Sequence, residues 1–404
     1  MTTNPLISGR GTAESAGRRP AALISVPTDL AAQTTAAVRI TRASGFIKTR
    51  PRDGAPNGTS SYSAILALVK DAGLLQRRTG FYWSVFGVLV ATLAAAFVLF
   101  AVLGDSWYQL IVAGALGILF TQFAFLSHEA AHRQIFASQK WNDHTGRYLG
   151  VFVAGLSYSW WMNKHTRHHG NPNTVGKDPD IAPDTISFLE EDAAKTSGLV
   201  RWLTQRQGYA FFPLLMGEGL NLHIVAVRSL ITGQNTKGKA KDRIIESSLL
   251  VARFGIYLGA VFTFLPFGMA WAFLGVQLAV FGIYMGASFA PNHKGMPIIA
   301  HDAKVDFFSR QVRTSRNIRG GAWVSHLMGG LNFQVEHHLF PSMARPNLRA
   351  ARLLVREHCA TLDVPYTETT LVKSYGIVVR YLNRVGLAAR DPFDCPLAAE
   401  LRVG

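Results

Sequence analysis

The sequence places most of its histidines in short clusters, and such clusters are typical of metal sites. Three of them, His165, His168 and His169, lie within MNKHTRHHGNPN, directly after the apolar run GVFVAGLSYSWW. Imidazole nitrogens are costly to bury in apolar surroundings unless something pairs with them. Neutral imidazole is a common metal ligand. We therefore expect this cluster to bind metal at the end of an apolar segment.

Further histidines follow other apolar segments in the same way. Two residues at i and i+4, as in SHEAAH, project from one face of a helix. The chain thus brings at least eight histidines to comparable positions. They are His128 and His132 in SHEAAH, His165, His168 and His169 in HTRHH, His293 in FAPNHKGMP, and His337 and His338 in NFQVEHHLFP.

The number of these nitrogens indicates two metal ions. A single protein-bound zinc takes three or four protein ligands, so eight or more imidazoles exceed the needs of one ion. Imidazole ligands suit zinc, copper, iron and nickel, and ligand type alone does not choose among them. The two cysteines, Cys359 and Cys395, form no CxxC pair, and we expect no thiolate site.

Two pairs of apolar runs are positioned to carry these clusters. The run 81–103 has no charged residue and is long enough to cross a bilayer. We expect two transmembrane hairpins, made by the runs 81–103 and 107–126 with a turn at 104–106, and by the runs 247–265 and 269–290 with a turn at 266–268.

The remaining apolar stretches predict elements that do not span. The run 150–162 is too short and favours a re-entrant or interfacial helix. Residues 209–232 mix Glu218, Asn221, His223 and Arg228 with apolar neighbours, which predicts a helix lying in the membrane interface. From about residue 340 the chain predicts a mostly helical cap.

Composition and charge support this organisation. Hydrophobic residues make up 49% of the 404-residue chain and charged residues 16%, which favours a membrane protein. The net charge of +16 fits a cytoplasmic face toward anionic lipid better than nucleic-acid binding. The two hairpin turns hold no Lys or Arg, whereas the opposite flanks hold Arg77, Arg78, Arg133, Lys140, Arg147, Lys241 and Arg243.

These patterns predict an all-α polytopic membrane protein with four transmembrane helices in two hairpins and a cytoplasmic helical cap. By the positive-inside rule, both termini and every histidine cluster face the cytoplasm. We expect a disordered basic tail over 1–60 and one domain over 61–404.

The segment HEAAH also fits H-E-x-x-H, the zinc-protease pattern, with Glu129 as general base. A protease would use one zinc and would leave HTRHH and QVEHH without a role. A second alternative is that the histidines only cap helices or bond lipid phosphates. It explains one or two clusters, but not a repeated membrane-proximal pattern.

Taken together, HEAAH, HTRHH and QVEHH resemble the three histidine boxes of the membrane fatty acid desaturase superfamily, in order. The resemblance covers about residues 80–345. The third box opens with Gln334, and this variant, with GGLNFQVEHHLFP around it, is similar to the front-end and actinobacterial acyl desaturase branch, Δ9 acyl-CoA desaturases included.

The resemblance implies which residues bind metal. The box ligands, expected to hold two irons, are His128, His132, His165, His168, His169, His337 and His338, with His293 as an extra ligand and His223 as a ninth nitrogen. Gln334, Asp178, Asp180 and Asn292 are candidates to hydrogen-bond the ligands or a metal-bound water. Trp160, Trp161 and Phe333 are candidates to line an apolar tunnel for the acyl chain between the transmembrane helices. Anchoring in the membrane interface is, however, the commoner role of tryptophan. His144, His301, His326 and His358 lie outside the pattern.

The implied reaction is the O2-dependent insertion of a cis double bond into an acyl chain, at Δ9 of a stearoyl- or palmitoyl-CoA. The iron centre carries this chemistry, without a separate acid or base. The resemblance further implies a ferredoxin- or flavin-linked NAD(P)H reductase as external electron donor. An acyl-lipid desaturase, at the front end or another position, and a related di-iron acyl hydroxylase remain alternatives.

Overall fold

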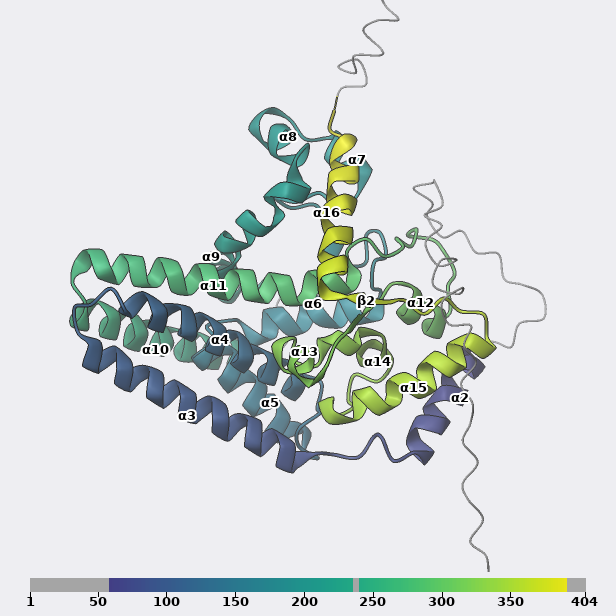
Figure 1. Cartoon of the computed structure of the whole chain (residues 1–404), viewed down its shortest axis with the longest axis horizontal. Coiled ribbons are helices and arrows are strands. Elements are labelled where there is room, and N and C mark those ends of the chain that lie inside the picture. The colour runs from purple at the N-terminus through teal and green to yellow at the C-terminus, as the bar shows by residue number, and fades with distance from the viewer. Residues whose placement is uncertain (1–57, 235–239, 391–404) are drawn as a thin grey trace, which may run out of the picture. The chain divides into compact units, whose positions relative to one another are not determined.

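The computed structural model describes residues 58–234 and 240–390, all of which belong to one compact unit, residues 45–404 (Figure 1). The expected tail over 1–60 falls almost wholly outside these residues, as does Cys395. The described chain is mainly helical. Its two strands, β1 (Asn317–Arg319) and β2 (Glu368–Thr370), pair in parallel with Asn317 opposite Glu368.

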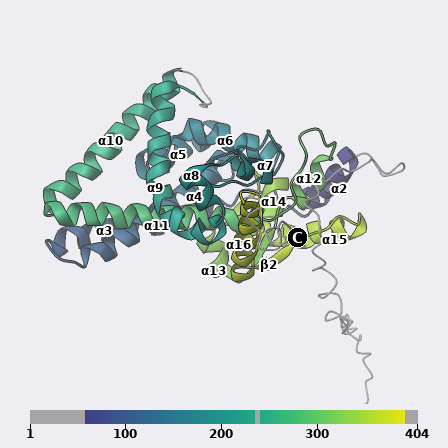
Figure 2. The same cartoon turned by 90° about the horizontal axis from the view of Figure 1, so that it is seen from above.

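Both expected hairpins are present. The first consists of α3 (Thr79–Leu103) and α4 (Gln109–Ala131), and the second of α10 (Ala240–Phe264) and α11 (Phe267–His293). Their turns lie at the same end of the structure (Figures 1 and 2). In the first turn, the buried Gln109 side chain donates hydrogen bonds to the carbonyls of Phe100 at 2.7 Å and Gly104 at 2.9 Å. The polar side chain thereby closes an otherwise apolar hairpin.

Glycines let the long helices approach closely. A methyl group at Gly117 of α4 would lie 2.8 Å from the carbonyl oxygen of Gln277 in α11. Gly219 of α9 (Gln207–Thr232) and Gly282 of α11 face each other's backbones in the same manner. Small residues at such contacts are typical of helix pairs in membranes. Figure 2 shows α9 crossing α11 at a large angle rather than running beside it as a hairpin partner.

Among the described residues, five helices are long and apolar enough to cross a membrane: α3, α4, α9, α10 and α11. The fifth is α9, for which the sequence predicted an interfacial position. The run 150–162 forms two short elements instead of one helix, a π-helix at Tyr148–Val153 and α6 at Tyr158–Gly170.

The start of α6 is fixed by a buried carboxylate on α10. Glu246, fully buried, accepts hydrogen bonds from the Ser157 hydroxyl at 3.1 Å and from the Ser159 backbone N–H and hydroxyl at 3.1 and 3.0 Å. Arg147, at the end of α5 (Gln139–Arg147), reaches the same carboxylate at 3.4 Å. These contacts hold the helix that carries HTRHH against the second hairpin.

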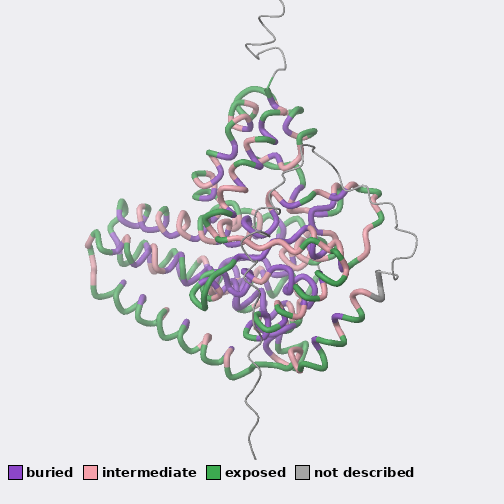
Figure 3. Tube along the Cα trace, turned by 45° about the vertical axis from the view of Figure 1, so that its right-hand side comes forward, coloured by how far each residue is buried: buried purple, intermediate pink, exposed green. Residues whose placement is uncertain are grey.

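The rest of the described chain forms the expected mostly helical cap. Buried residues gather where this cap meets the hairpin ends (Figure 3). One apolar cluster joins α2 (Gly58–Asp71) to the cap through Ile65, Val69 and Phe308. The other cap helices are α7 (Glu190–Ala194), α8 (Gly198–Thr204), α12 (Phe307–Arg313), α13 (Ala322–Leu327), α14 (Gln334–Leu339), α15 (Arg345–Thr361) and α16 (Leu371–Leu387).

Candidate metal centre

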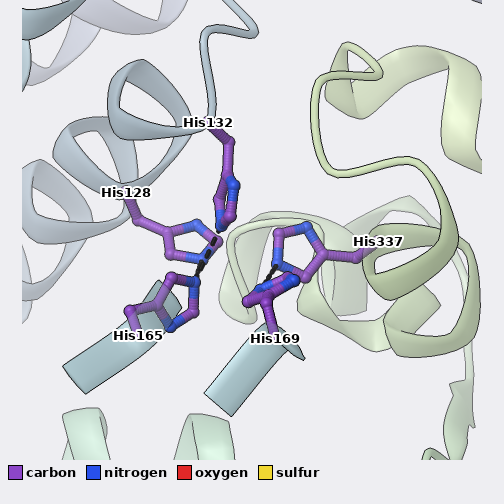
Figure 4. A group of neighbouring side chains, drawn as sticks. All are labelled: His128, His132, His165, His169 and His337. Atoms are coloured by element: carbon purple, nitrogen blue, oxygen red, sulfur yellow. Dashed lines mark hydrogen bonds between the residues drawn. The ribbon is translucent and has the colours of Figure 1, made fainter. Parts of the chain in front are cut away.

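Five of the expected ligands converge at the end of α4. The five-histidine group consists of His128, His132, His165, His169 and His337, from α4 and its C-cap, α6 and α14. Each offers a ring nitrogen within 4.8 Å of the others, and Figure 4 shows the rings pointing toward one another. The Nε2–Nε2 distances are 3.1 Å for His128 and His165, 2.7 Å for His132 and His165, and 3.1 Å for His169 and His337.

The other three expected ligands form a second group beside the first. The three-histidine group consists of His168 of α6, His293 at the end of α11 and His338 of α14. The Nε2 atoms of His168 and His293 are 3.3 Å apart. The two groups adjoin, because the rings of His169 and His338 stack with their centroids 4.2 Å apart.

The nitrogen spacings fit bound metal ions. Two nitrogens that are each roughly 2.1 Å from one ion lie roughly 3.0–3.4 Å apart at octahedral to tetrahedral angles. Three of the four Nε2–Nε2 distances, from 3.1 to 3.3 Å, lie in this range. Moreover, Nε2 of His338 is buried without a hydrogen-bond partner among the described residues. A buried orphaned lone pair of this kind is what a metal ion satisfies.

Hydrogen bonds to the Nδ1 atoms orient the rings of the three-histidine group so that their Nε2 atoms face one another. The Nδ1–H of His293 donates to the carbonyl of Thr314 at 2.9 Å, and that of His338 donates to Oε1 of Gln311 at 2.9 Å. His168 bonds Oδ1 of Asp178 through Nδ1 at 3.0 Å. Each bond fixes the tautomer and leaves Nε2 with its lone pair facing the group, as in ligand histidines whose second nitrogen is held by an oxygen.

Burial keeps most of these rings neutral, which is the form that binds metal. It lowers the pKa of His132 to about 3. It also holds the pKa of His165, His169, His337 and His338 well below the usual value, and neighbouring imidazoles lower them further.

His168 is the exception. Burial acts to lower its pKa, but the carboxylates of Asp178 and Asp180 outweigh burial and raise it. Asp178 is itself held by the backbone N–H of Asn173 at 2.7 Å, and Asp180 pairs with Lys164 at 3.0 Å. This edge of the three-histidine group therefore stabilises a positive charge, whether a proton or a metal ion. Asp178 hydrogen-bonds Nδ1 of His168, whereas Oδ2 of Asp180 lies 3.4 Å from the same nitrogen.

Gln334 and Asn292 also reach the three-histidine group. Nε2 of Gln334 lies 2.9 Å from Nε2 of His293. The Asn292 amide in turn donates to Oε1 of Gln334 at 3.0 Å and to the Leu331 carbonyl at 3.0 Å. The carboxamide thus adjoins the ligand atom of His293, held there by its neighbour.

The structure does not bring His223 to either group. Its Nδ1–H donates to the Gly219 carbonyl of its own helix at 2.6 Å, and its ring lies 5.5 Å from Phe254 and 5.7 Å from Phe281. The expectation of a ninth nitrogen fails here, because α9 crosses α11 at Gly219 and His223 faces Gly155 instead of either histidine group.

Glu129 is turned away from the histidines. Its carboxylate accepts from Nε of Arg345 at 2.6 Å and from a second nitrogen of the same guanidinium, and the two side chains are 2% and 6% exposed. The Tyr82 hydroxyl lies 3.5 Å away. A carboxylate committed to this pair is not placed to act as the general base of a zinc protease.

A narrow central cavity adjoins the five-histidine group. It has a volume of about 20 Å³ and is lined by His128, Trp161, Phe289 and Met285 among others. Trp161 also stacks on His165, with centroids 4.2 Å apart, so this tunnel candidate lies at the site. Trp160 and Phe333 do not line the cavity. Trp160 lies under the Lys164 ammonium at 5.8 Å, and Phe333 packs in the cap.

Two residues of the site escaped sequence reasoning. Gln311 and the Thr314 carbonyl belong to it through contacts distant in the chain. Gln311 also donates to the His169 carbonyl at 2.9 Å, which ties both groups to α12. A polar residue on the buried face of an amphipathic cap helix is the only sequence signal, and it is a weak one.

Comparison with known proteins agrees with this site. The chain matches the fatty acid desaturase family model over residues 105–370. The chain therefore belongs to the fatty acid desaturase family. The match includes every histidine of the two groups.

Three relatives show the range of the similarity. A Δ8 fatty acid desaturase of Helianthus annuus is 28% identical over 71% of this chain and 65% of its own length. An acyl-lipid (9-3)-desaturase of Borago officinalis is 27% identical over 68% and 63%. A Δ8 fatty acid desaturase of Euglena gracilis is 31% identical over 68% of each. The chain thus spans just under two thirds of the first two relatives.

These names do not support one expectation. The sequence favoured a Δ9 desaturase of acyl-CoA, whereas the relatives are named for Δ8 and for acyl-lipid (9-3) desaturation. The three relatives are eukaryotic, and they do not test the expected actinobacterial branch.

Proposed function

We propose that the chain is an O2-dependent desaturase of acyl chains esterified in membrane lipid, with two irons held by the eight histidines. The observation that carries this proposal is the pair of adjoining histidine groups directly beside an apolar cavity. Two reducible irons supply, with O2 and electrons, an oxidant that removes hydrogen from an unactivated methylene.

The chain's own residues would hold and orient this chemistry. The five-histidine group would hold one iron and the three-histidine group the other. The outer contacts of Thr314, Gln311 and Asp178 orient three of the rings. Trp161 stacks on His165 and covers one side of the first group. Phe289 and Met285 would present apolar side chains to an acyl chain that enters the adjoining cavity.

We further propose that four helices span the membrane and that α9 lies in the interface. Both ends of α9 contact elements on the histidine side of the structure. At its start, Gln207 donates to the Leu382 carbonyl of α16 at 3.0 Å. Just past its end, Gly233 adjoins Arg243, near Asp242, which pairs with Arg147 at 3.0 Å. A helix that begins and ends on one side of a bilayer does not cross it.

This topology would place the histidine groups, α2 and α16 on the cytoplasmic side. A separate ferredoxin- or flavin-linked reductase would then deliver electrons there. Basic side chains of the cap, such as Arg349, Arg356 and Arg380, would speed its encounter by complementary charge.

Lipid analysis of a host expressing the protein tests the function. A suitable reductase is co-expressed, lipid classes are separated, and double-bond positions are mapped by mass spectrometry. We expect a new unsaturated chain in intact membrane lipids, lost in His165→Ala and retained in His301→Ala, a matched change of an exposed histidine outside both groups. A hydroxylated chain would instead establish the hydroxylase. New unsaturation appearing first in acyl-CoA would refute the lipid-bound substrate.

A further inference from the structure

One face of α9 presents a continuous apolar stripe away from the protein. Its large side chains recur at three-, four- and seven-residue intervals, so they lie on one face of the helix. The opposite face packs on α11 through Gly219 and Leu215. The stripe consists of Tyr209, Met216, Leu220, Ile224, Val227 and Ile231, with Tyr209 75% and Ile231 76% exposed. In a membrane protein such a face meets lipid.

A groove opens where this stripe meets α10. The α9–α10 groove has a volume of about 440 Å³, within the size range of small-molecule pockets. Its walls are almost entirely apolar atoms. Its lining residues are His223, Ile224, Val227, Arg228, Ile231, Thr232 and Phe254.

The lining of this groove contacts the chain segment that lines the central cavity. Nε2 of His223 faces Gly155, where an added methyl group would lie only 2.7 Å from it. Gly155 has φ +78°, a left-handed conformation that glycine adopts without strain. The next residue, Leu156, lines the central cavity together with His128. His223 of the groove lining and Leu156 of the cavity lining thus both adjoin Gly155.

Cations lie at the other end of the groove. Arg228 is exposed and contributes mainly the apolar part of its side chain to the lining, so its guanidinium extends beyond it. Arg243 lies against Gly233, just past the end of α9. The acid beside them, Asp242, is already paired with Arg147 at 3.0 Å. An apolar groove that ends at cations is complementary to an acyl chain with an anionic head group.

We propose that the α9–α10 groove binds an acyl chain of an anionic phospholipid, with its phosphate at Arg228 and Arg243, and is the lateral entrance to the central cavity. This inference rests on the proposed function and extends it. The site would take its substrate sideways from the bilayer, past His223, rather than from water. It also gives His223 a role that its distance from both histidine groups leaves open.

Photolabelling tests binding without relying on turnover. The protein is reconstituted in vesicles of phosphatidylcholine and phosphatidylglycerol that contain phosphatidylglycerol with a mid-chain diazirine, and labelled peptides are mapped. We expect labelling of 223–232 about tenfold above an equal length of α3, corresponding to about 1.4 kcal/mol of preferential occupancy. Equal labelling of both helices would refute the site.

Two groove variants and a matched control sharpen the test. Val227→Trp fills the groove and is expected to reduce labelling of 223–232 about tenfold, whereas Val98→Trp, at an exposed position of α3, leaves it unchanged. Arg228→Gln is expected to remove the preference for phosphatidylglycerol over phosphatidylcholine. If labelling of 223–232 is unchanged in Val227→Trp, the proposal that the groove binds an acyl chain is wrong. If the preference for phosphatidylglycerol is unchanged in Arg228→Gln, the proposed phosphate contact is wrong.

The same variants separate the entrance from the reaction. We expect Val227→Trp, but not Val98→Trp, to reduce desaturation of vesicle phospholipid about tenfold. Normal turnover with lost labelling would refute the entrance. If the wild-type protein desaturates nothing, the proposed function fails, and the labelling pattern still decides whether the groove binds lipid.

Discussion

The buried pair of Glu129 and Arg345 predicts a specific pattern of stability changes. Arg345→Met leaves a carboxylate that is 2% exposed without its cation, and removing one partner of a buried ion pair costs about 3–5 kcal/mol. Glu129→Gln leaves the buried guanidinium without its anion, at a similar cost. The double variant buries neither charge and is expected to recover at least about half of the loss.

Denaturant unfolding of the iron-loaded protein in one detergent measures these four free energies as a double-mutant cycle. The Arg352–Glu368 pair is the control, because it has the same two-pronged geometry with side chains 24% and 13% exposed. Arg352→Met should cost less than Arg345→Met, because the carboxylate that it leaves unpaired is less deeply buried. If the Glu129 and Arg345 changes add without coupling, the buried-pair reasoning is wrong. If the double variant binds iron but makes no product, Glu129 has a chemical role.

Five further changes test other parts of the structure. His293→Ala is expected to release about one of two irons, whereas His223→Ala keeps both, and metal analysis of purified protein distinguishes them. Asp178→Asn should weaken iron binding about 10–100-fold in a chelator competition, because it weakens the hydrogen bond that orients His168. Glu246→Leu should destabilise the start of α6 by about 1–3 kcal/mol, measured by unfolding, since Ser157 and Ser159 lose their acceptor. Gly282→Leu should destabilise the α9–α11 crossing by about 1–3 kcal/mol or more, and unfolding unchanged from the wild type would refute the tight crossing.

The hairpins and the histidine groups were predictable because their signals are local. Uncharged apolar runs long enough to cross a bilayer predict α3 and α4. The spacing in HTRHH places three histidine rings within one and a half turns of α6. His293 followed from its position at the end of an apolar run and from the family resemblance.

The failures depend on distant contacts. His223 and His293 both lie in or directly after an apolar segment of the sequence. The direction of α9 across α11 depends on the contact between Gly219 and Gly282, and no local sequence pattern predicts that direction. The partner of Glu129 is Arg345, which lies 216 positions later. A backbone acceptor such as the Thr314 carbonyl leaves no mark in the sequence, because every residue carries the same group.

Each histidine group joins a different hairpin to the same two helices. The five-histidine group links the end of α4 to α6 and α14, and the three-histidine group links the end of α11 to them. With iron bound as proposed, each ion is a cross-link between one hairpin and a shared platform. Metal loading would then be the last step of assembly, after both hairpins have inserted. Loss of one ion would detach one hairpin from α6 and α14 and leave the other hairpin attached. Two different partly assembled forms would therefore exist, one for each ion, and both would be substrates for the cell's quality-control proteases.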